Sequence, residues 1–187
     1  MTSTSASGSP GEDERYDRLY FDTSVLANLA RADLVGIVPA TVANPRTSYA
    51  VQAELDAGVG AGYDDLARAL DWLRDPLDPD PDESPGIAVA GSLVRQRKPE
   101  LRDRLAASDA SVLYQAWAAN VPLATDDRDV RTVADSYAVP VTGSLGLVVR
   151  AVEHGELSIE TAEAALETWR SEGHAVAIDG VADLLEE

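Results

Sequence analysis

Short apolar runs that end in aspartate alternate with helical stripes along this chain. The run at residues 18–21 stops at Asp22, and the run at residues 121–125 stops at Asp126 and Asp127. Each run has the length of a buried strand, and a helical pattern follows each acid. We therefore expect strands that deliver aspartates at their carboxyl ends.

The remaining periodicity predicts several helices. A stripe of Leu105, Val112, Leu113 and Ala116 defines one of them, and Asp109 falls on that stripe. Region 34–47 stays ambiguous because two prolines interrupt it, and 87–90 and 138–141 are short strand candidates. Strands that alternate with helices indicate an α/β fold with a mostly parallel sheet. The predicted helices cover residues 25–33, 48–58, 62–73, 93–105 (with a break or a new start at Pro99), 108–120, 130–134, 143–152 and 160–170.

The domain organisation follows from composition. Residues 1–17 are rich in serine and acid, without a basic start or an apolar stretch, so we expect a disordered tail and no targeting signal. Residues 18–187 form one domain with a Pro/Asp-rich insertion at about 75–86. No window approaches a membrane span, so we expect a cytoplasmic protein that does not contact membranes.

Charge and cysteine content narrow the chemistry. The chain has no cysteine, which excludes disulfide scaffolds and thiolate ligands. The net charge is −18, 20 of the 33 acids are aspartate, and Lys98 is the single lysine. A surface rich in aspartate and poor in lysine resembles that of proteins from salt-accumulating organisms, so we interpret most of this charge as a halophilic, solvated coat.

A few acids are placed differently from this coat. Asp22, Asp126 and Asp127 end strands, while Glu54 and Asp109 interrupt apolar helix faces. Converging carboxylates repel one another unless a cation joins them, and an all-oxygen ligand set suits Mg²⁺ or Mn²⁺. Such a site hydrolyses phosphodiesters. Simpler roles stay open, because each acid could also be a helix cap or a solvated helix residue.

The same acids carry a resemblance to PIN-domain ribonucleases. Four acids stand in the family's order with similar flanks, and the similarity extends over about residues 18–178. The segments are 19–26 (LYFDTSVL), 48–55 (SYAVQAEL), 108–113 (SDASVL), 123–128 (LATDDR) and 141–146 (VTGSLG), the last being similar to an archaeal branch of PIN-like proteins.

This resemblance implies a three-layer α/β/α sandwich that cleaves single-stranded RNA with Mg²⁺ or Mn²⁺. It assigns the catalytic positions to Asp22, Glu54, Asp109 and Asp127. Asp22, Asp109 and Asp127 would ligate the metal, with Asp126 assisting or holding a second ion, and Glu54 would complete the shell or orient water.

Relatives of this kind include toxins of toxin–antitoxin modules. A toxin role, a small antitoxin-like partner and a homodimer are therefore expected, beside RNA as substrate. The alternative is a catalytically weak PIN-like module that binds RNA or a protein partner.

Other candidate residues have weaker signals. Hydroxyls at Thr23 or Ser24 are expected to cap the first helix and to bond the metal-binding carboxylates. His154 and His174 are expected at the surface, and Trp72, Trp117 and Trp169 in the core or at interfaces. One basic cluster is either a phosphate contact or a charge-balanced helix face. Its members are Arg95, Arg97, Lys98, Arg102 and Arg104.

Overall fold

The computed structural model describes residues 15–73, 86–88, 91–174, 176 and 178–182. Residues 1–14 of the expected tail and 75–85 of the expected insertion lie outside this part. The first strand begins at Tyr16, so the domain starts before residue 18. No described helix has the length and apolar character needed to cross a bilayer.

A parallel sheet forms the centre of the molecule. Its strands lie in the order β3-β2-β1-β4-β5, and every neighbouring pair is parallel. This confirms the predicted α/β class. The strands are β1 (Tyr16–Phe21), β2 (Val42–Ser48), β3 (Gly86–Ala88), β4 (Leu123–Ala124) and β5 (Val141–Thr142).

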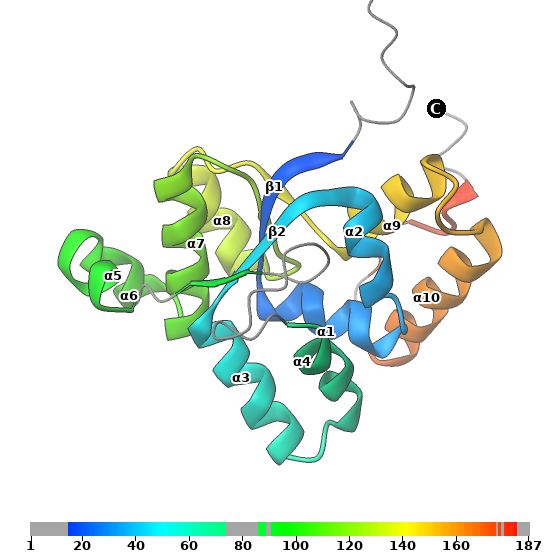
Figure 1. Cartoon of the computed structure of the whole chain (residues 1–187), viewed down its shortest axis with the longest axis horizontal. Coiled ribbons are helices and arrows are strands. Elements are labelled where there is room, and N and C mark those ends of the chain that lie inside the picture. The colour runs from blue at the N-terminus through cyan, green and yellow to red at the C-terminus, as the bar shows by residue number, and fades with distance from the viewer. Residues whose placement is uncertain (1–14, 74–85, 89–90, 175, 177, 183–187) are drawn as a thin grey trace, which may run out of the picture.

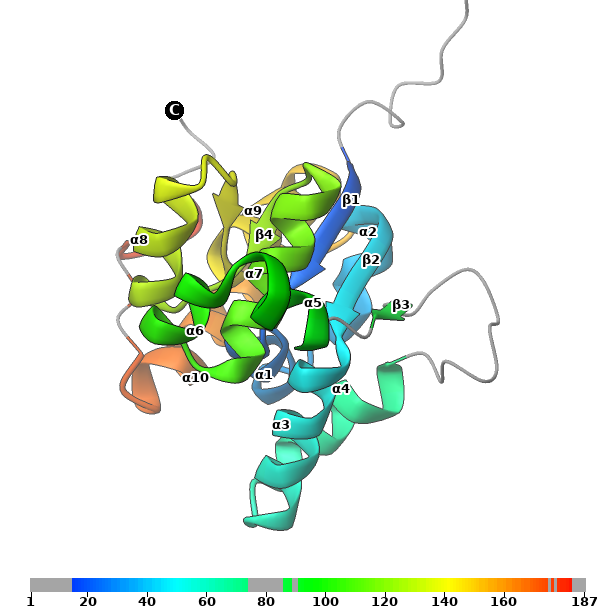
Figure 2. The same ribbon diagram turned by 90° about the vertical axis from the view of Figure 1, so that its left-hand side faces the viewer.

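Helices flank the sheet on both sides. Figure 1 shows α7 and α8, with α5 and α6 beyond them, on one side and α1, α2, α9 and α10 on the other, while α3 and α4 extend past the sheet (Figures 1 and 2). The layers thus match the expected three-layer sandwich. The helices are α1 (Thr23–Arg31), α2 (Val38–Thr41), α3 (Tyr49–Gly60), α4 (Ala67–Trp72), α5 (Gly91–Arg97), α6 (Pro99–Arg104), α7 (Ala107–Ala119), α8 (Arg128–Ser136), α9 (Ser144–Glu153) and α10 (Ile159–Ser171), with short 3₁₀ turns η1 (Val35–Ile37) and η2 (Asp64–Leu66).

Three elements differ from the sequence prediction. The ambiguous region contains β2, in which Pro45 is paired with Leu19 of β1 and precedes the described residues that pair with β3. The helix expected at 62–73 starts later, since Gly62 turns the chain at φ 99°. The strand expected at 138–141 begins only at Val141, because Ala138 has a left-handed φ of 54°.

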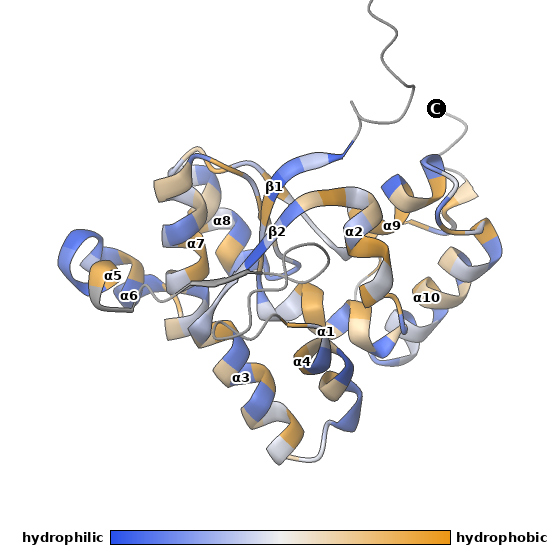
Figure 3. Ribbon diagram, in the orientation of Figure 1, coloured by the Kyte–Doolittle hydropathy of each residue, from blue (hydrophilic) through white to orange (hydrophobic). Residues whose placement is uncertain are grey.

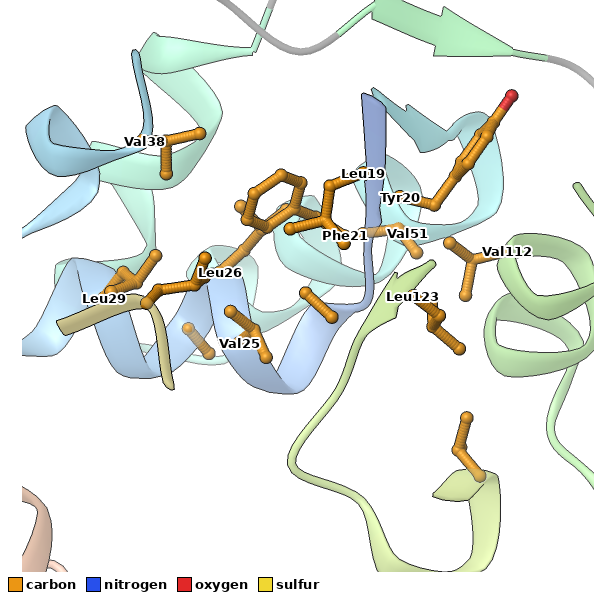
Figure 4. Packing of buried hydrophobic residues seen from close by; sticks show 14 of the residues in the cluster. Leu19, Tyr20, Phe21, Val25, Leu26, Leu29, Val38, Val51, Val112 and Leu123 are labelled. Carbon is orange, nitrogen blue, oxygen red and sulfur yellow. The ribbon is translucent and has the colours of Figure 1, made fainter. Parts of the chain in front are cut away.

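The core lies on both faces of β1. Leu19, Tyr20 and Phe21 are all buried, as expected for a parallel strand covered by helices on each side. Figure 4 shows Leu19 and Phe21 on the side of Leu26, while Tyr20 points the opposite way, toward Val112. Apolar and polar stretches lie side by side on α8 and α10 (Figure 3), whereas α7 is buried on all sides from Ala110 to Ala116.

Lys98, at the start of α6, packs against two aromatic rings of neighbouring segments. Its Nζ lies 4.5 Å from the centroid of the Trp117 ring and 5.1 Å from that of Tyr137. The Tyr137 hydroxyl donates to Glu100 Oε1 at 3.1 Å. The lysine of the basic cluster therefore makes a cation–π contact within the fold.

The strand order places a switch point at β1. From β1 the chain adds β2 and then β3 on one side, and afterwards returns to add β4 on the other. Open parallel sheets bind ligands beyond the carboxyl ends of the strands at such a point. Asp22, Asp126 and Asp127 follow the ends of β1 and β4, as the sequence predicts.

Candidate functional site: an acidic cluster at the switch point

Asp22 is the most buried acid of the site. It follows β1, its N–H donates to the carbonyl of Ala124 on β4 at 2.9 Å, and it is 1% exposed. Its carboxylate accepts hydrogen bonds from Thr23 N at 2.7 Å, Ser24 Oγ at 3.0 Å and Thr125 Oγ1 at 2.6 Å. Burial raises the pKa of Asp22, opposed by these hydrogen bonds. Asp22 itself is the N-cap of α1, so the predicted cap at Thr23 or Ser24 is wrong.

Glu54 reaches the same region from α3. This exposed side chain accepts a hydrogen bond from Thr23 Oγ1 at 2.7 Å. Its negative charge also contributes to raising the pKa of Asp22. The adjacent hydroxyls of Thr23 and Ser24 thus orient Glu54 and Asp22 respectively, and both bond acids of the site as predicted.

Asp109 lies in the first turn of α7 and is half-buried. Burial, followed by the charges of Asp22, Glu54 and Asp127, raises its pKa to about 7. Four carboxylates from separate segments are therefore close enough to interact. We call Asp22, Glu54, Asp109 and Asp127 the acidic cluster.

Asp127 completes this cluster from the loop after β4. It is the N-cap of α8, where its Oδ1 accepts from the N–H groups of Asp129 at 2.7 Å and Val130 at 2.9 Å. Its own N–H donates to Thr125 Oγ1 at 3.2 Å, and that hydroxyl donates to Asp22. Thr125 therefore links the two strand-end acids, a role that the sequence did not indicate.

Asp126 points to a different set of partners. Its carboxylate accepts from Asn28 Nδ2 at 2.8 Å and from the backbone N and Oγ of Ser144 at 3.0 and 2.5 Å, and it lies 3.7 Å from Arg131 Nη2. We call Asp126, Asn28, Ser144 and Arg131 the Asp126 network. A Cβ on Gly143 would meet Arg131 and Asp126, so this close approach requires glycine. The metal-binding role expected of Asp126 stays a prediction beside these contacts with protein donors.

The acidic cluster has no internal counter-charge. Within the described residues, no arginine or lysine forms an ion pair with any of its four members. No group of three or more Asp, Glu, His or Cys side chains in this part of the chain is arranged so that it could hold a metal ion. The cluster offers only carboxylate oxygens, which are the ligands that hard cations prefer. A group of three is not required, because Mg²⁺ usually binds through only one or two carboxylates and keeps several waters.

Asn28 and Ser144 were not predicted as site residues. Asn28 could have been noticed as a polar residue within the apolar run of α1, where it is buried at 6% exposure. Ser144 begins α9 within the glycine-containing segment of the resemblance, but its target lies 18 residues earlier.

Comparison with known proteins agrees with this geometry. No curated protein and no solved structure gives a significant match. One family model, described as "DUF3368: PIN domain", matches residues 19–187, which include every strand-end acid and the helices that carry Glu54 and Asp109. With acids at the switch point of a parallel sheet and a match over nearly its whole length, the chain belongs to the PIN-domain family.

Proposed function

We propose that this chain is a metal-dependent endoribonuclease that hydrolyses phosphodiester bonds of single-stranded RNA. PIN domains are commonly nucleases that use divalent metals, which supports the general class. The observation that carries the proposal is the acidic cluster, in which four carboxylates from distant segments interact and no arginine or lysine of the described residues forms an ion pair with them.

The charge pattern of the cluster fits a divalent ion. Burial, followed by repulsion from the neighbouring charges, raises the pKa of Asp109 to about 7. A cation relieves this repulsion, and oxygen donors without thiolate or imidazole favour Mg²⁺ or Mn²⁺. We assign Asp22, Asp109 and Asp127 as the residues that would hold the ion, one or two of them directly and the others through its waters. When bound, it would supply charge neutralisation of the phosphodiester and an acidified water.

The protein groups have separable tasks in this proposal. Asp22 is fixed by hydrogen bonds and by burial, so it provides a rigid anchor. Glu54 is exposed and held by Thr23 Oγ1, a position suited to orienting an attacking water. Thr125 sets Asp22 and Asp127 relative to one another, so it is a positioning residue.

Cleavage of labelled single-stranded RNA in high salt, with Mn²⁺ or Mg²⁺, tests the activity. We expect Asp22→Asn to reduce the rate at least about 100-fold, because the first anchor of the ion loses its charge. The matched control is Asp135→Asn on α8, an exposed aspartate outside the cluster, which should cleave like the wild type. Equal rates for the wild type and Asp22→Asn, at equal melting temperatures, would refute the proposal and point to contamination.

The biological setting remains a prediction from the family resemblance. A toxin role predicts that a small antitoxin-like protein binds this chain and inhibits cleavage, and a homodimer predicts twice the monomer mass in light scattering. Inhibition by the product of a neighbouring small gene would support the toxin role.

A further inference from the structure

A pocket of about 410 Å³ lies beside the acidic cluster. Leu145, Trp169 and Val176 give it apolar walls, while Asp126, Arg131 and His174 give it polar ones. Its volume is within the usual range of small-ligand sites, which combine apolar walls with a few polar groups.

The pocket and the acidic cluster share a wall. Asp126 belongs to the pocket and its neighbour Asp127 to the cluster. Ser24 Oγ joins them, since it donates to Asp22 Oδ2 at 3.0 Å and accepts from Asp126 N at 3.0 Å. The pocket and the acidic cluster therefore adjoin at residues 126–127, which we call the shared wall.

The walls of the pocket are held in place before any ligand binds. Asn28 and Ser144 donate to the Asp126 carboxylate. The indole Nε1 of Trp169 donates to the carbonyl of Asn28 at 2.8 Å, and Trp169 is only 3% exposed. Ordered walls lower the entropic cost of binding.

The polar wall presents donors next to an acceptor. The guanidinium of Arg131 lies 3.7 Å from Asp126 Oδ1, and its side chain is 42% exposed. His174 is 39% exposed and lies near Arg31 and Glu172. A ligand edge that carries both acceptors and donors would match this wall, and a planar ring would match the apolar ones.

Two other ligand classes fit less well. A free phosphate would meet the negative charge of Asp126, and a purely apolar ligand would leave the polar groups of the wall without partners, which costs free energy. Nucleobases have polar edges with donors and acceptors side by side, and flat apolar faces.

We propose that this pocket binds one nucleobase of the RNA strand, next to the phosphodiester at the acidic cluster. The inference rests on the proposed ribonuclease function, since that function brings the RNA to the shared wall. The pocket then gives the enzyme a preference for the base at one position beside the cut.

Binding without cleavage tests this proposal. Calorimetric titration of the full chain in EDTA should show saturable binding of at least one of the four nucleoside monophosphates. Ribose 5-phosphate, which has the sugar and phosphate without the base, should bind at least about tenfold more weakly. Equal binding of ribose 5-phosphate, or no binding of any mononucleotide, would overturn the proposal, and this comparison needs no variant.

A matched pair of variants locates the binding. Leu145→Trp fills the pocket and should weaken mononucleotide binding at least about tenfold, because the base would clash with the new ring. Val149→Trp makes the same change one turn further along α9, where the residue does not line the pocket, and should bind like the wild type. Equal affinities of the two folded variants would overturn the assignment to this pocket.

The two proposals fail separately. Mononucleotide binding that is kept while Mn²⁺-dependent cleavage is absent would refute the ribonuclease function and leave a nucleotide site. Cleavage with no base-dependent binding and no preference at the position beside the cut would refute the pocket alone.

Discussion

Replacing Asp109 with asparagine should stabilise the metal-free fold, by an amount that grows with pH. The pKa of Asp109 is raised from 3.8 to about 7 by burial and by the neighbouring charges of Asp22, Glu54 and Asp127. A carboxyl whose pKa is higher in the folded chain binds its proton more tightly there. Its contribution is therefore most favourable below its unfolded pKa and is lost as the pH rises to about 7. Asparagine does not titrate and avoids this loss.

The size of the effect follows from the pKa. Between about pH 5 and the folded pKa, the ionisation costs at most about 2.7 kcal/mol, at about 1.4 kcal/mol per pH unit. Water screens a half-buried carboxyl, so we expect about 1 kcal/mol. Above the folded pKa the difference between variant and wild type should level off.

Urea unfolding in EDTA, at about pH 5 and about pH 8, measures this change. The quantity of interest is the stability of Asp109→Asn minus that of the wild type, which should be larger at the higher pH. Asp103→Asn on α6 is the control, because this exposed aspartate lies outside the acidic cluster. A difference that is equal at both pH values would refute the claim that burial and neighbouring charges raise the pKa of Asp109.

Three further outcomes are expected. Millimolar Mn²⁺ should raise the melting temperature of the wild type more than that of acidic-cluster variants, and an unchanged melting temperature would argue against metal binding. Lys98→Met should lower the free energy of unfolding by about 1 kcal/mol, because the charge between Trp117 and Tyr137 is lost. Urea unfolding measures this change, and Lys98→Arg should keep most of the stability because arginine keeps the charge. Gly143→Ala should cost about 1–3 kcal/mol in the same assay, because its Cβ would meet the Asp126 network. Gly36→Ala, whose Cβ has no atom within 4 Å, should change stability by less than about 0.5 kcal/mol, and equal effects would refute the steric argument.

The acids that lie on strong local patterns could be found from the sequence. Asp22 ends an apolar run, and Asp109 interrupts an apolar stripe. Burying a carboxylate at such a position costs free energy unless it has partners, so both positions indicate a special role. Glu54 has a weaker mark, since it interrupts an apolar helix face in the sequence but is exposed in the structure. The family resemblance assigned it a catalytic position, and Thr23 donates a hydrogen bond to it in the structure.

Other features depend on contacts between distant segments. Asp126 and Asp127 are adjacent in sequence, yet one bonds Asn28, which is 98 residues away, and the other caps α8. No local pattern separates their roles. Strand β2 could not be predicted either, because Pro45 argues locally against a strand, whereas its pairing with β1 is a property of the whole sheet.

The contact of Lys98 has a further consequence for chemical labelling. It is the single lysine of the chain, and its side chain is 24% exposed beside the Trp117 ring. Apart from the chain terminus, an amine-reactive reagent therefore has one target. Acylation removes the positive charge on which the cation–π contact depends. Because every other cationic side chain except histidine is an arginine, a reagent can abolish this one contact without a substitution.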